Sequence, residues 1–169
     1  MSRVYLSLGT NLGNKRAHLL QAIGHIAETI GRFSAISSVY ETKPWGFESE
    51  NDFMNMMVCV ETLLSPAEIL TITQSIEKKI GRTQKTNQSY RDRIIDIDLI
   101  AYDDRILQSE NLQLPHPLFH QRRFVLEPFN EIAPDYVHPI LQKKVSELLS
   151  DSCFAAYSAK SITFASNNS

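Results

Sequence analysis

Two aspartates separated by a single residue are the clearest candidates for chemistry in this sequence. Asp96 and Asp98 lie in an apolar segment that reads Ile-Ile-Asp-Ile-Asp-Leu-Ile. Alternate side chains of a β-strand point to opposite faces, so both acids project from one face with their Cα atoms about 6–7 Å apart. Carboxylates at this spacing can hold one hydrated Mg²⁺ or bridge a metal pair, and Mg²⁺ held in this way also takes phosphate oxygens. The spacing predicts a Mg²⁺ site for a phosphate-bearing substrate.

The structural alternative is a solvated strand face on which two acids happen to be neighbours. A basic loop upstream favours the functional interpretation, because two like charges need a neighbouring cation. Residues 82–93 have no apolar periodicity. Their cationic side chains could bind phosphates: Arg82, Lys85, Arg91 and Arg93. Arg93 precedes Asp96 by three positions, where it could clamp a transferring phosphoryl group or form a salt bridge to that acid.

Two further motifs give weaker signals. The turn Gly9-Thr-Asn-Leu-Gly13 lacks the Gly-Lys-Ser/Thr sequence of a P-loop, so we interpret it as a structural turn. His116 lies in a Pro-His-Pro turn, and a single histidine there is usually structural. The stretch Arg122-Arg123-Phe124 adds two cations and an aromatic ring after this turn.

Composition limits the class of protein. The chain has 169 residues, of which 43% are hydrophobic and 21% charged, which indicates one globular domain and excludes disorder or a membrane span. A net charge of −2 argues against nonspecific nucleic-acid binding. Cys59 and Cys153 suggest neither a disulfide framework nor a metal cluster. The N-terminal residues enter a strand pattern with no signal-peptide h-region, so we expect a cytoplasmic protein.

The hydrophobic pattern predicts alternating strands and helices. One helix is expected from Asn14 to Gly31, where the glycine would supply a left-handed cap. A second begins at the capping box Ser65-Pro-Ala-Glu68 and ends before Gly81. Four segments have strand character: 4–8, 33–42, 53–62 and 94–102.

This element order, βαββαβ, predicts a ferredoxin-like α+β sandwich with its helices on one sheet face. A C-terminal extension should follow, with a hairpin at 105–114, short helices within 118–132 and a helix at 145–149. We expect one domain over residues 1–150. The tail, 151–169, has no clear structural signal.

Several segments together resemble one family, the hydroxymethyl-dihydropterin pyrophosphokinases, and the resemblance runs from about residue 4 to residue 149. It implies a folate-synthesis enzyme that transfers the terminal diphosphate of ATP to the hydroxymethyl group of 6-hydroxymethyl-7,8-dihydropterin and releases AMP. The segments that carry it are Leu8-Gly-Thr-Asn-Leu-Gly13, Tyr40-Glu-Thr-Lys-Pro-Trp-Gly46, Phe53-Met-Asn55, Glu77 with Gly81-Arg82, Arg93-Ile-Ile-Asp-Ile-Asp98 and Leu114-Pro-His116.

The resemblance also implies roles for individual residues. Asp96 and Asp98 would hold two Mg²⁺ ions, and Arg82 and Arg93 would assist transfer. The pterin would be bound by Thr42, Lys43, Trp45, Phe53, Asn55, Tyr90 and Phe124. ATP would be bound by Gln74, Glu77, Lys85, Arg91, Arg93, Leu99, His116 and Arg122. Core packing is the alternative for the two phenylalanines, and a solvated helix position is the alternative for Glu77.

The sequence departs from the family pattern in the basic loop. It reads Ser-Tyr-Arg-Asp-Arg at 89–93, and Gln84 stands where a family arginine is common. Asn111 and Gln113 also differ from residues that often contact ATP. Whether Lys85 or Arg91 substitutes is left open, and we hypothesise that residues 83–92 form a lid that closes Tyr90 over the pterin.

We expect direct in-line attack of the pterin hydroxyl on the β-phosphorus of ATP, with Asp98 as a possible proton acceptor. A metal-dependent phosphohydrolase or nuclease is the alternative enzyme. A ferredoxin-like RNA-binding module is the alternative from another class, although the sheet lacks the expected aromatic signature. We expect a monomer that binds neither nucleic acid nor membranes.

Overall fold

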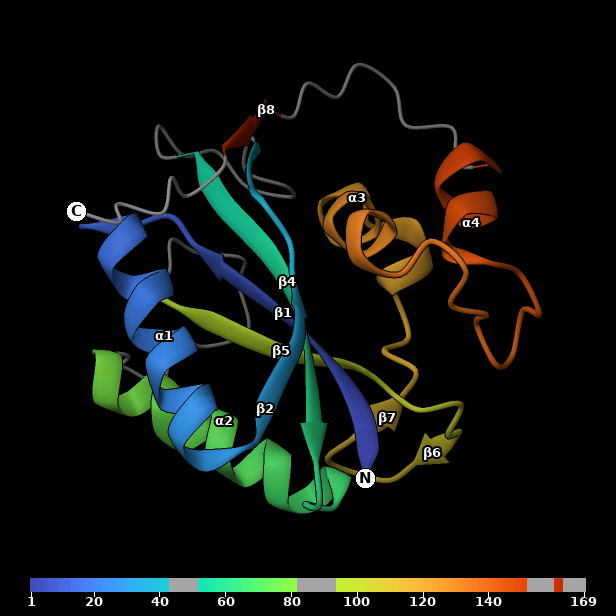
Figure 1. Cartoon of the computed structure of the whole chain (residues 1–169), viewed down its shortest axis with the longest axis horizontal. Helices are drawn as coiled ribbons and strands as arrows, with labels where there is room; N and C mark the ends of the chain where they lie inside the picture. The colour runs from blue at the N-terminus through green and yellow to red at the C-terminus, as the bar shows by residue number, and fades with distance from the viewer. Residues whose placement is uncertain (43–51, 82–93, 152–159, 163–169) are drawn as a thin grey trace.

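An antiparallel sheet between two layers of helices forms the part of the chain described by this computed structural model, residues 1–42, 52–81, 94–151 and 160–162 (Figure 1). The strand order is β5-β1-β4-β3-β8, and β2 also pairs with β4. This order confirms the ferredoxin-like α+β fold. The strands span Ser2–Thr10 (β1), Arg32–Ile36 (β2), Val39–Thr42 (β3), Phe53–Thr62 (β4), Asp96–Tyr102 (β5) and Lys160–Ile162 (β8).

Two helices cover one face of the sheet, as the hydrophobic pattern predicts. Helix α1 (Lys15–Thr29) begins at Asn14, whose side chain accepts the N–H of Ala17. Helix α2 (Pro66–Ile80) begins with the predicted capping box, in which Ser65 and Glu68 exchange hydrogen bonds of 2.7 and 3.3 Å. The apolar sides of both helices enclose one core with the sheet, and its fully buried members include Leu6, Leu8, Leu19, Ile26, Met56, Ile69 and Ile76.

The predicted left-handed cap at Gly31 is wrong. Helix α1 ends on Ile30 in a right-handed conformation, and among the described residues the glycines with positive φ are Gly13 (66°) and Gly81 (133°). Gly31 is needed for a different reason: a Cβ placed there would lie 2.0 Å from the carbonyl oxygen of Glu61. Close approach between the α1–β2 connection and β4 therefore selects glycine, and this contact is invisible in the local sequence.

The predicted strand at 33–42 is two strands, β2 and β3, that pair in succession with β4. The break falls at Ser37 and Ser38. The Ser37 N–H donates to the carbonyl of Met57 at 2.9 Å, and its hydroxyl accepts the Met57 N–H at 2.8 Å. A side chain has thus replaced one backbone acceptor of the ladder. Ser38 turns away from β4 toward the second helical layer.

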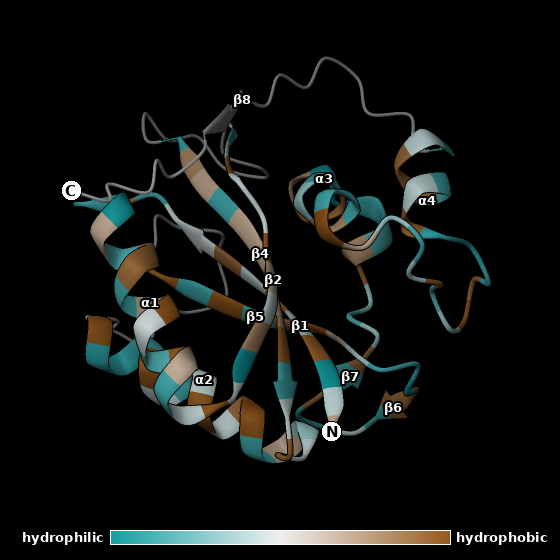
Figure 2. Cartoon of the chain, in the orientation of Figure 1, coloured by the Kyte–Doolittle hydropathy of each residue, from teal (hydrophilic) through white to brown (hydrophobic). Residues whose placement is uncertain are grey.

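The C-terminal extension forms this second layer, on the opposite face of the sheet (Figure 1). The expected hairpin and short helices are confirmed as β6 (Leu107–Gln108), β7 (Gln113–Leu114), the 3-10 helix η1 (Phe119–Gln121), α3 (Arg123–Ile132) and α4 (Val145–Asp151). Figure 2 shows both apolar and polar residues along α3, and its apolar residues Val125, Leu126 and Phe129 are buried. They complete a second core that includes Tyr5, Met57, Phe119, Val125, Leu126 and Phe129.

Part of the C-terminal tail returns to the sheet. Strand β8 pairs antiparallel with β3, with Ile162 opposite Val39 and Lys160 opposite Glu41. The tail segment thus lies beside the strand that carries Thr42. No helix in the described ranges combines the length and apolar character needed to cross a membrane.

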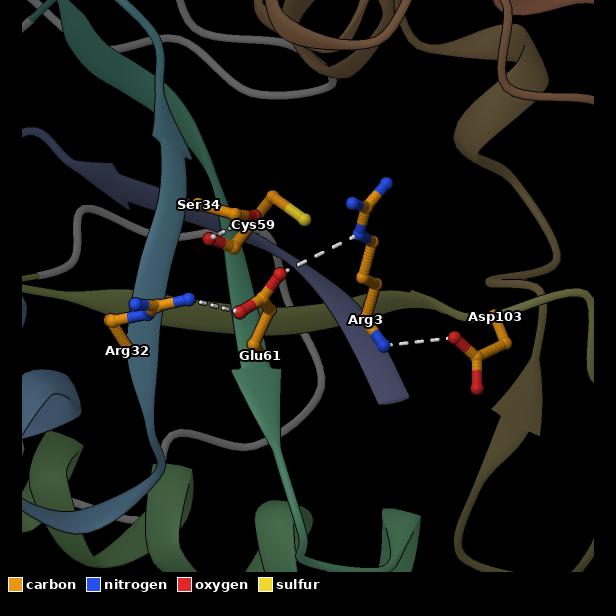
Figure 3. Close-up of polar contacts among 6 residues, drawn as sticks. All are labelled: Arg3, Arg32, Ser34, Cys59, Glu61 and Asp103. Carbon is orange, nitrogen blue, oxygen red and sulfur yellow. Dashed lines mark hydrogen bonds and ion pairs between the residues drawn. The ribbon is translucent and has the colours of Figure 1, made fainter. Parts of the chain in front are cut away.

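Charged contacts join three strands at the end of the sheet where β4 finishes (Figure 3). Glu61 forms a 2.8 Å ion pair with Arg32 on β2, and its carboxylate lies 3.9 Å from the guanidinium of Arg3 on β1. The backbone N–H of Arg3 donates to Asp103 at 2.8 Å. Six residues of an extended strand, about 20 Å, separate Glu61 from Asn55, so these contacts belong to the scaffold rather than the candidate site.

Candidate active site

The two aspartates lie where the alternation of β5 places them. Both are half-buried, whereas Ile97 and Leu99 between and beyond them are buried in the core beneath α1 and α2. Asp98 is opposite Ser7 of β1, which is opposite Met57 of β4 in the second core. Residues directly opposite on neighbouring strands share a face. The prediction that both acids project from one face is confirmed, and that face is the one covered by α3.

Asp96 belongs to a row that crosses three strands. It is opposite Gly9 of β1, which is opposite Asn55 of β4. Neighbouring strands are about 4.8 Å apart, so the Cα atoms of Asp96 and Asn55 are about 10 Å apart with a glycine between them. A carboxylate and a carboxamide therefore flank a stretch of sheet without a side chain.

Asn55 is held in one orientation. Its Nδ2 donates to the hydroxyl of Thr42 at 3.0 Å, and both residues are buried. This bond directs Oδ1 toward β1, where a Cβ on Gly9 would approach it to 2.8 Å. The glycine in the strand thus makes room for the Asn55 oxygen, a role that an interpretation of Gly9 as part of a turn does not include. A glycine inside a strand is the signal that could have indicated it.

Glu77 is not a solvated helix position. It is 5% exposed near the end of α2, and its Oε1 accepts the backbone N–H of Ile97 at 2.8 Å. Ile97 lies between the two aspartates. The buried carboxylate therefore fixes the backbone from which both acids project, whatever it contributes to ATP binding.

Replacing Glu77 with alanine should lower the free energy of unfolding by about 2–3 kcal/mol, because a buried N–H loses a charged acceptor. We expect kcat to fall about tenfold as β5 loses its anchor, whereas Glu77→Gln keeps an acceptor and should lose less of both. Urea unfolding and steady-state kinetics measure the two quantities. Gln74→Ala on the same helix is the control, because Gln74 is exposed and its predicted contact is with ATP. A Glu77→Ala protein with unchanged stability and only a higher KM for ATP would contradict the anchoring role.

His116 is a neutral hydrogen-bonding group at this site. Its backbone N–H donates to the carbonyl of Ile100 on β5 at 2.8 Å, and its Nδ1 accepts the N–H of Leu118 at 3.2 Å. Burial, and then the charge of Arg122, lower the pKa of His116 to about 4. At neutral pH the ring proton therefore lies on Nε2, which can donate to a ligand oxygen.

The low pKa of His116 makes stability depend on pH. The unfolded chain binds a proton near pH 6.5 and the folded chain only near pH 4, so folding loses stability as the pH falls through this window. We expect His116→Asn, whose Oδ1 can still accept the Leu118 N–H, to reduce the stability difference between pH 7 and pH 4.5 by about 2 kcal/mol. Urea unfolding at both pH values measures it. An equal difference in both proteins would contradict burial of a neutral ring.

The remaining described candidates surround the same strands. The Arg122 guanidinium carbon lies 5.7 Å from the centre of the Phe124 ring, at the start of α3. Phe53 shares the face of Asn55 and is opposite Thr42. The Leu99 side chain is in the core, so any contact it makes with ATP must come from its backbone.

Seven candidates lie outside the described residues, and their roles stay predictions. They are Lys43, Trp45, Arg82, Lys85, Tyr90, Arg91 and Arg93. The lid hypothesis falls on the same segments.

Comparisons with known proteins identify the family of the chain. The family model of 7,8-dihydro-6-hydroxymethylpterin-pyrophosphokinase (HPPK) matches residues 5–134. A 2-amino-4-hydroxy-6-hydroxymethyldihydropteridine pyrophosphokinase from Porphyromonas gingivalis is 46% identical over 141 residues, 82% of this chain and 95% of that protein. The Aquifex aeolicus protein of the same name is 37% identical over 147 residues, 87% of this chain and 90% of that one.

A solved structure supports the fold alone. The Plasmodium falciparum HPPK-DHPS structure aligns with a TM-score of 0.69 at 18% identity, over 88% of this chain and 44% of that longer chain. The family match covers most of the described sheet and both helical layers through α3. The chain therefore belongs to the 7,8-dihydro-6-hydroxymethylpterin-pyrophosphokinase family.

Proposed function

We propose that the two substrates bind side by side on the sheet face that carries Asp96 and Asn55, with the pterin over β4 and ATP beside β5. Membership of the family makes the chain a diphosphotransferase of folate biosynthesis, which transfers diphosphate from ATP to hydroxymethyldihydropterin. The row of Asp96, Gly9 and Asn55 is the observation that supports this placement. It leaves backbone without a side chain between the acid proposed to act on phosphate and the amide proposed to bind the pterin ring.

Asn55 and Thr42 suit the edge of a pterin. With Nδ2 committed to the Thr42 hydroxyl, Asn55 presents Oδ1 as an acceptor, and a pterin offers N–H donors at its ring edge. Phe53 and Phe124 lie on the side of the sheet where the ring would bind, and offset stacking on a flat heteroaromatic adds about 0.5–1.5 kcal/mol per aromatic contact. The amide gives specificity and the rings give affinity.

Asp96 and Asp98 fit a Mg²⁺ site. Outside residues 43–51, 82–93, 152–159 and 163–169, no group of three or more His, Cys, Asp or Glu side chains could hold a metal. Two carboxylates are enough for Mg²⁺, which usually completes its coordination with water and substrate phosphates. When bound, the ion would neutralise charge on the phosphates of ATP and favour attack on phosphorus. The expected number, two ions, stays a prediction.

The protein's own residues position the reacting groups. Asn55 and Thr42 would orient the pterin so that its hydroxymethyl oxygen faces the β-phosphorus, and this alignment supplies much of the rate enhancement in phosphoryl transfer. His116 would donate from Nε2 to a phosphate oxygen without adding charge, and Arg122 would add a cation beside it. Asp98 would take the hydroxyl proton as the new O–P bond forms and AMP departs.

The alternatives of a phosphohydrolase or an RNA-binding module gain no support, because the two relatives described above are both pyrophosphokinases. Release of AMP from ATP and Mg²⁺ by the purified protein, with and without 6-hydroxymethyl-7,8-dihydropterin, tests the function. AMP that appears only with the pterin supports diphosphate transfer. ADP or phosphate released without it would favour a hydrolase. Activity that persists in excess EDTA would contradict the Mg²⁺ requirement.

A cytoplasmic, monomeric protein that binds neither nucleic acid nor membranes stays a prediction. Sedimentation velocity of the purified chain, with and without ATP, would test the oligomeric state.

A further inference from the structure

The carboxylate of Glu131, near the end of α3, accepts several hydrogen bonds from one short segment of the sheet. The N–H of Ser38 donates to its two carboxylate oxygens at 3.1 and 2.9 Å, and the Ser38 hydroxyl donates at 2.7 Å. The hydroxyl of Tyr40 on β3 donates to Oε2 at 2.7 Å. Short hydrogen bonds to an ionised acceptor are the strong ones, and several donors on one carboxylate also fix its direction. We call Glu131, Ser38 and Tyr40 the α3–β3 clamp.

The clamp lies next to the residues assigned to the pterin. Tyr40 is directly opposite Asn55 on β4, so the two side chains share a face about 5 Å apart at their Cα atoms. Thr42, whose hydroxyl accepts a hydrogen bond from the Asn55 amide, is two residues further along β3. Any shift of β3 relative to β4 would therefore move the hydroxyl that orients Asn55.

Glu131 also lies on the same helix as Phe124, the residue predicted to stack on the pterin. Phe124 and Glu131 are seven residues apart on α3, almost two full helical turns, so they lie on the same side of the helix and about 10 Å apart along it. The helix is attached to the sheet mainly by apolar side chains: Val125, Leu126 and Phe129. Apolar packing is not directional, whereas hydrogen bonds are. The clamp thus sets the position of α3 along β3.

We infer that Glu131 is a positioning residue for the pterin site and that it holds the Phe124 ring at a fixed distance from the Asn55–Thr42 pair. This inference rests on the pterin site proposed above. Burial and the hydrogen bond to Glu131 also raise the pKa of Tyr40, so its hydroxyl stays a donor throughout the working pH range. Glu131 itself touches neither substrate in this assignment.

The test compares Glu131→Gln with Glu127→Gln on the same helix. Glu127 accepts a local 2.6 Å hydrogen bond from Arg123, four residues earlier, and its charge also helps to raise the pKa of Tyr40. Glu127→Gln is therefore the matched control for the loss of one charge near Tyr40. For Glu131→Gln we expect the KM for the pterin to rise about tenfold, with the KM for ATP within about twofold of the original. Tyr40→Phe, which removes one of the bonds and keeps the ring, should raise the pterin KM about threefold. The control should change neither KM.

Two further comparisons distinguish a failure of this inference from a failure of the proposed pterin site. Asn55→Ala should raise the pterin KM more than Glu131→Gln does, and the double variant Glu131→Gln/Tyr40→Phe should show less than the product of the two single effects, because both changes break one clamp. If Asn55→Ala raises the pterin KM and Glu131→Gln does not, the inference is overturned and the pterin site stands. If neither changes it, both are overturned. Equal increases in both substrate KM values, with a Tm loss larger than the control's, would make Glu131 a general stabilising residue and also overturn the inference.

Discussion

Asp96→Ala is expected to lower kcat for diphosphate transfer by about 10³-fold or more while the free energy of unfolding stays within about 1 kcal/mol of the original. The acid is half-buried on the face of β5 that lies on the α3 side of the sheet, and Asp98 is its like-charged neighbour on that face. Removing it therefore leaves no cavity in either core. It does remove one of two carboxylates that would hold Mg²⁺ against the phosphates of ATP, and that contribution is largest in the transition state.

The measurement is AMP release under saturating substrates, together with urea unfolding of the same preparations. Asp104→Ala is the matched control, because Asp104 is an exposed aspartate just beyond the other end of β5 and should leave both quantities unchanged. Asp96→Asn keeps the shape and loses the charge, so it should behave like the alanine variant if the carboxylate acts on a metal. Parallel losses of activity and stability would instead identify the two acids as a structural pair.

Gly31→Ala is expected to cost about 3 kcal/mol or more of folding free energy, because the added methyl group has no room. Its Cβ would lie 2.0 Å from the Glu61 carbonyl oxygen and 3.2 Å from a methyl group of Val60. That carbonyl belongs to β4, which is paired on both sides by β1 and β2. The backbone on both sides is therefore held, and the clash can be relieved only by breaking sheet contacts.

The same substitution at Gly24 should have the opposite sign. Gly24 is exposed within α1, and a Cβ there would meet nothing within 4 Å. Alanine should stabilise the protein by about 0.5–1 kcal/mol, because glycine loses more backbone freedom in a helix. Urea unfolding at pH 7 compares the two variants. Since the Glu61 end of β4 is far from Asn55, kcat per folded molecule should not change in either. A Gly31→Ala protein as stable as the original would show that the α1–β2 connection can move away.

Which of these effects could be expected from the sequence depends on how far apart the interacting residues are. Spacing within a few residues predicts the face shared by Asp96 and Asp98 and the capping box of Ser65 and Glu68, and both are confirmed. It also predicts the ferredoxin-like order of elements, which is confirmed with its second strand divided into β2 and β3. Local chemistry fixes them, because alternation and capping act through the backbone nearby. The family resemblance is confirmed by the match over residues 5–134.

Spacing within a few residues cannot predict contacts between distant segments. Gly31 is required by Glu61, thirty residues later, and Glu77 turns inward because Ile97 presents an N–H twenty residues away. The roles of the basic loop, Lys43 and Trp45 stay predictions, as does the division into a domain at 1–150 and a tail.

The sequence by itself determined the chemistry available to this protein: two acids on one strand face, an asparagine and aromatic residues in other segments, and the order of elements that carries them. The tertiary structure decided how these groups are held. It placed the open backbone of Gly9 between Asp96 and Asn55, fixed the backbone of β5 with Glu77 and joined α3 to β3 through Glu131. The reason is physical, because strand alternation is a property of consecutive residues, whereas register, close approach and buried hydrogen bonds exist only between segments brought together by folding.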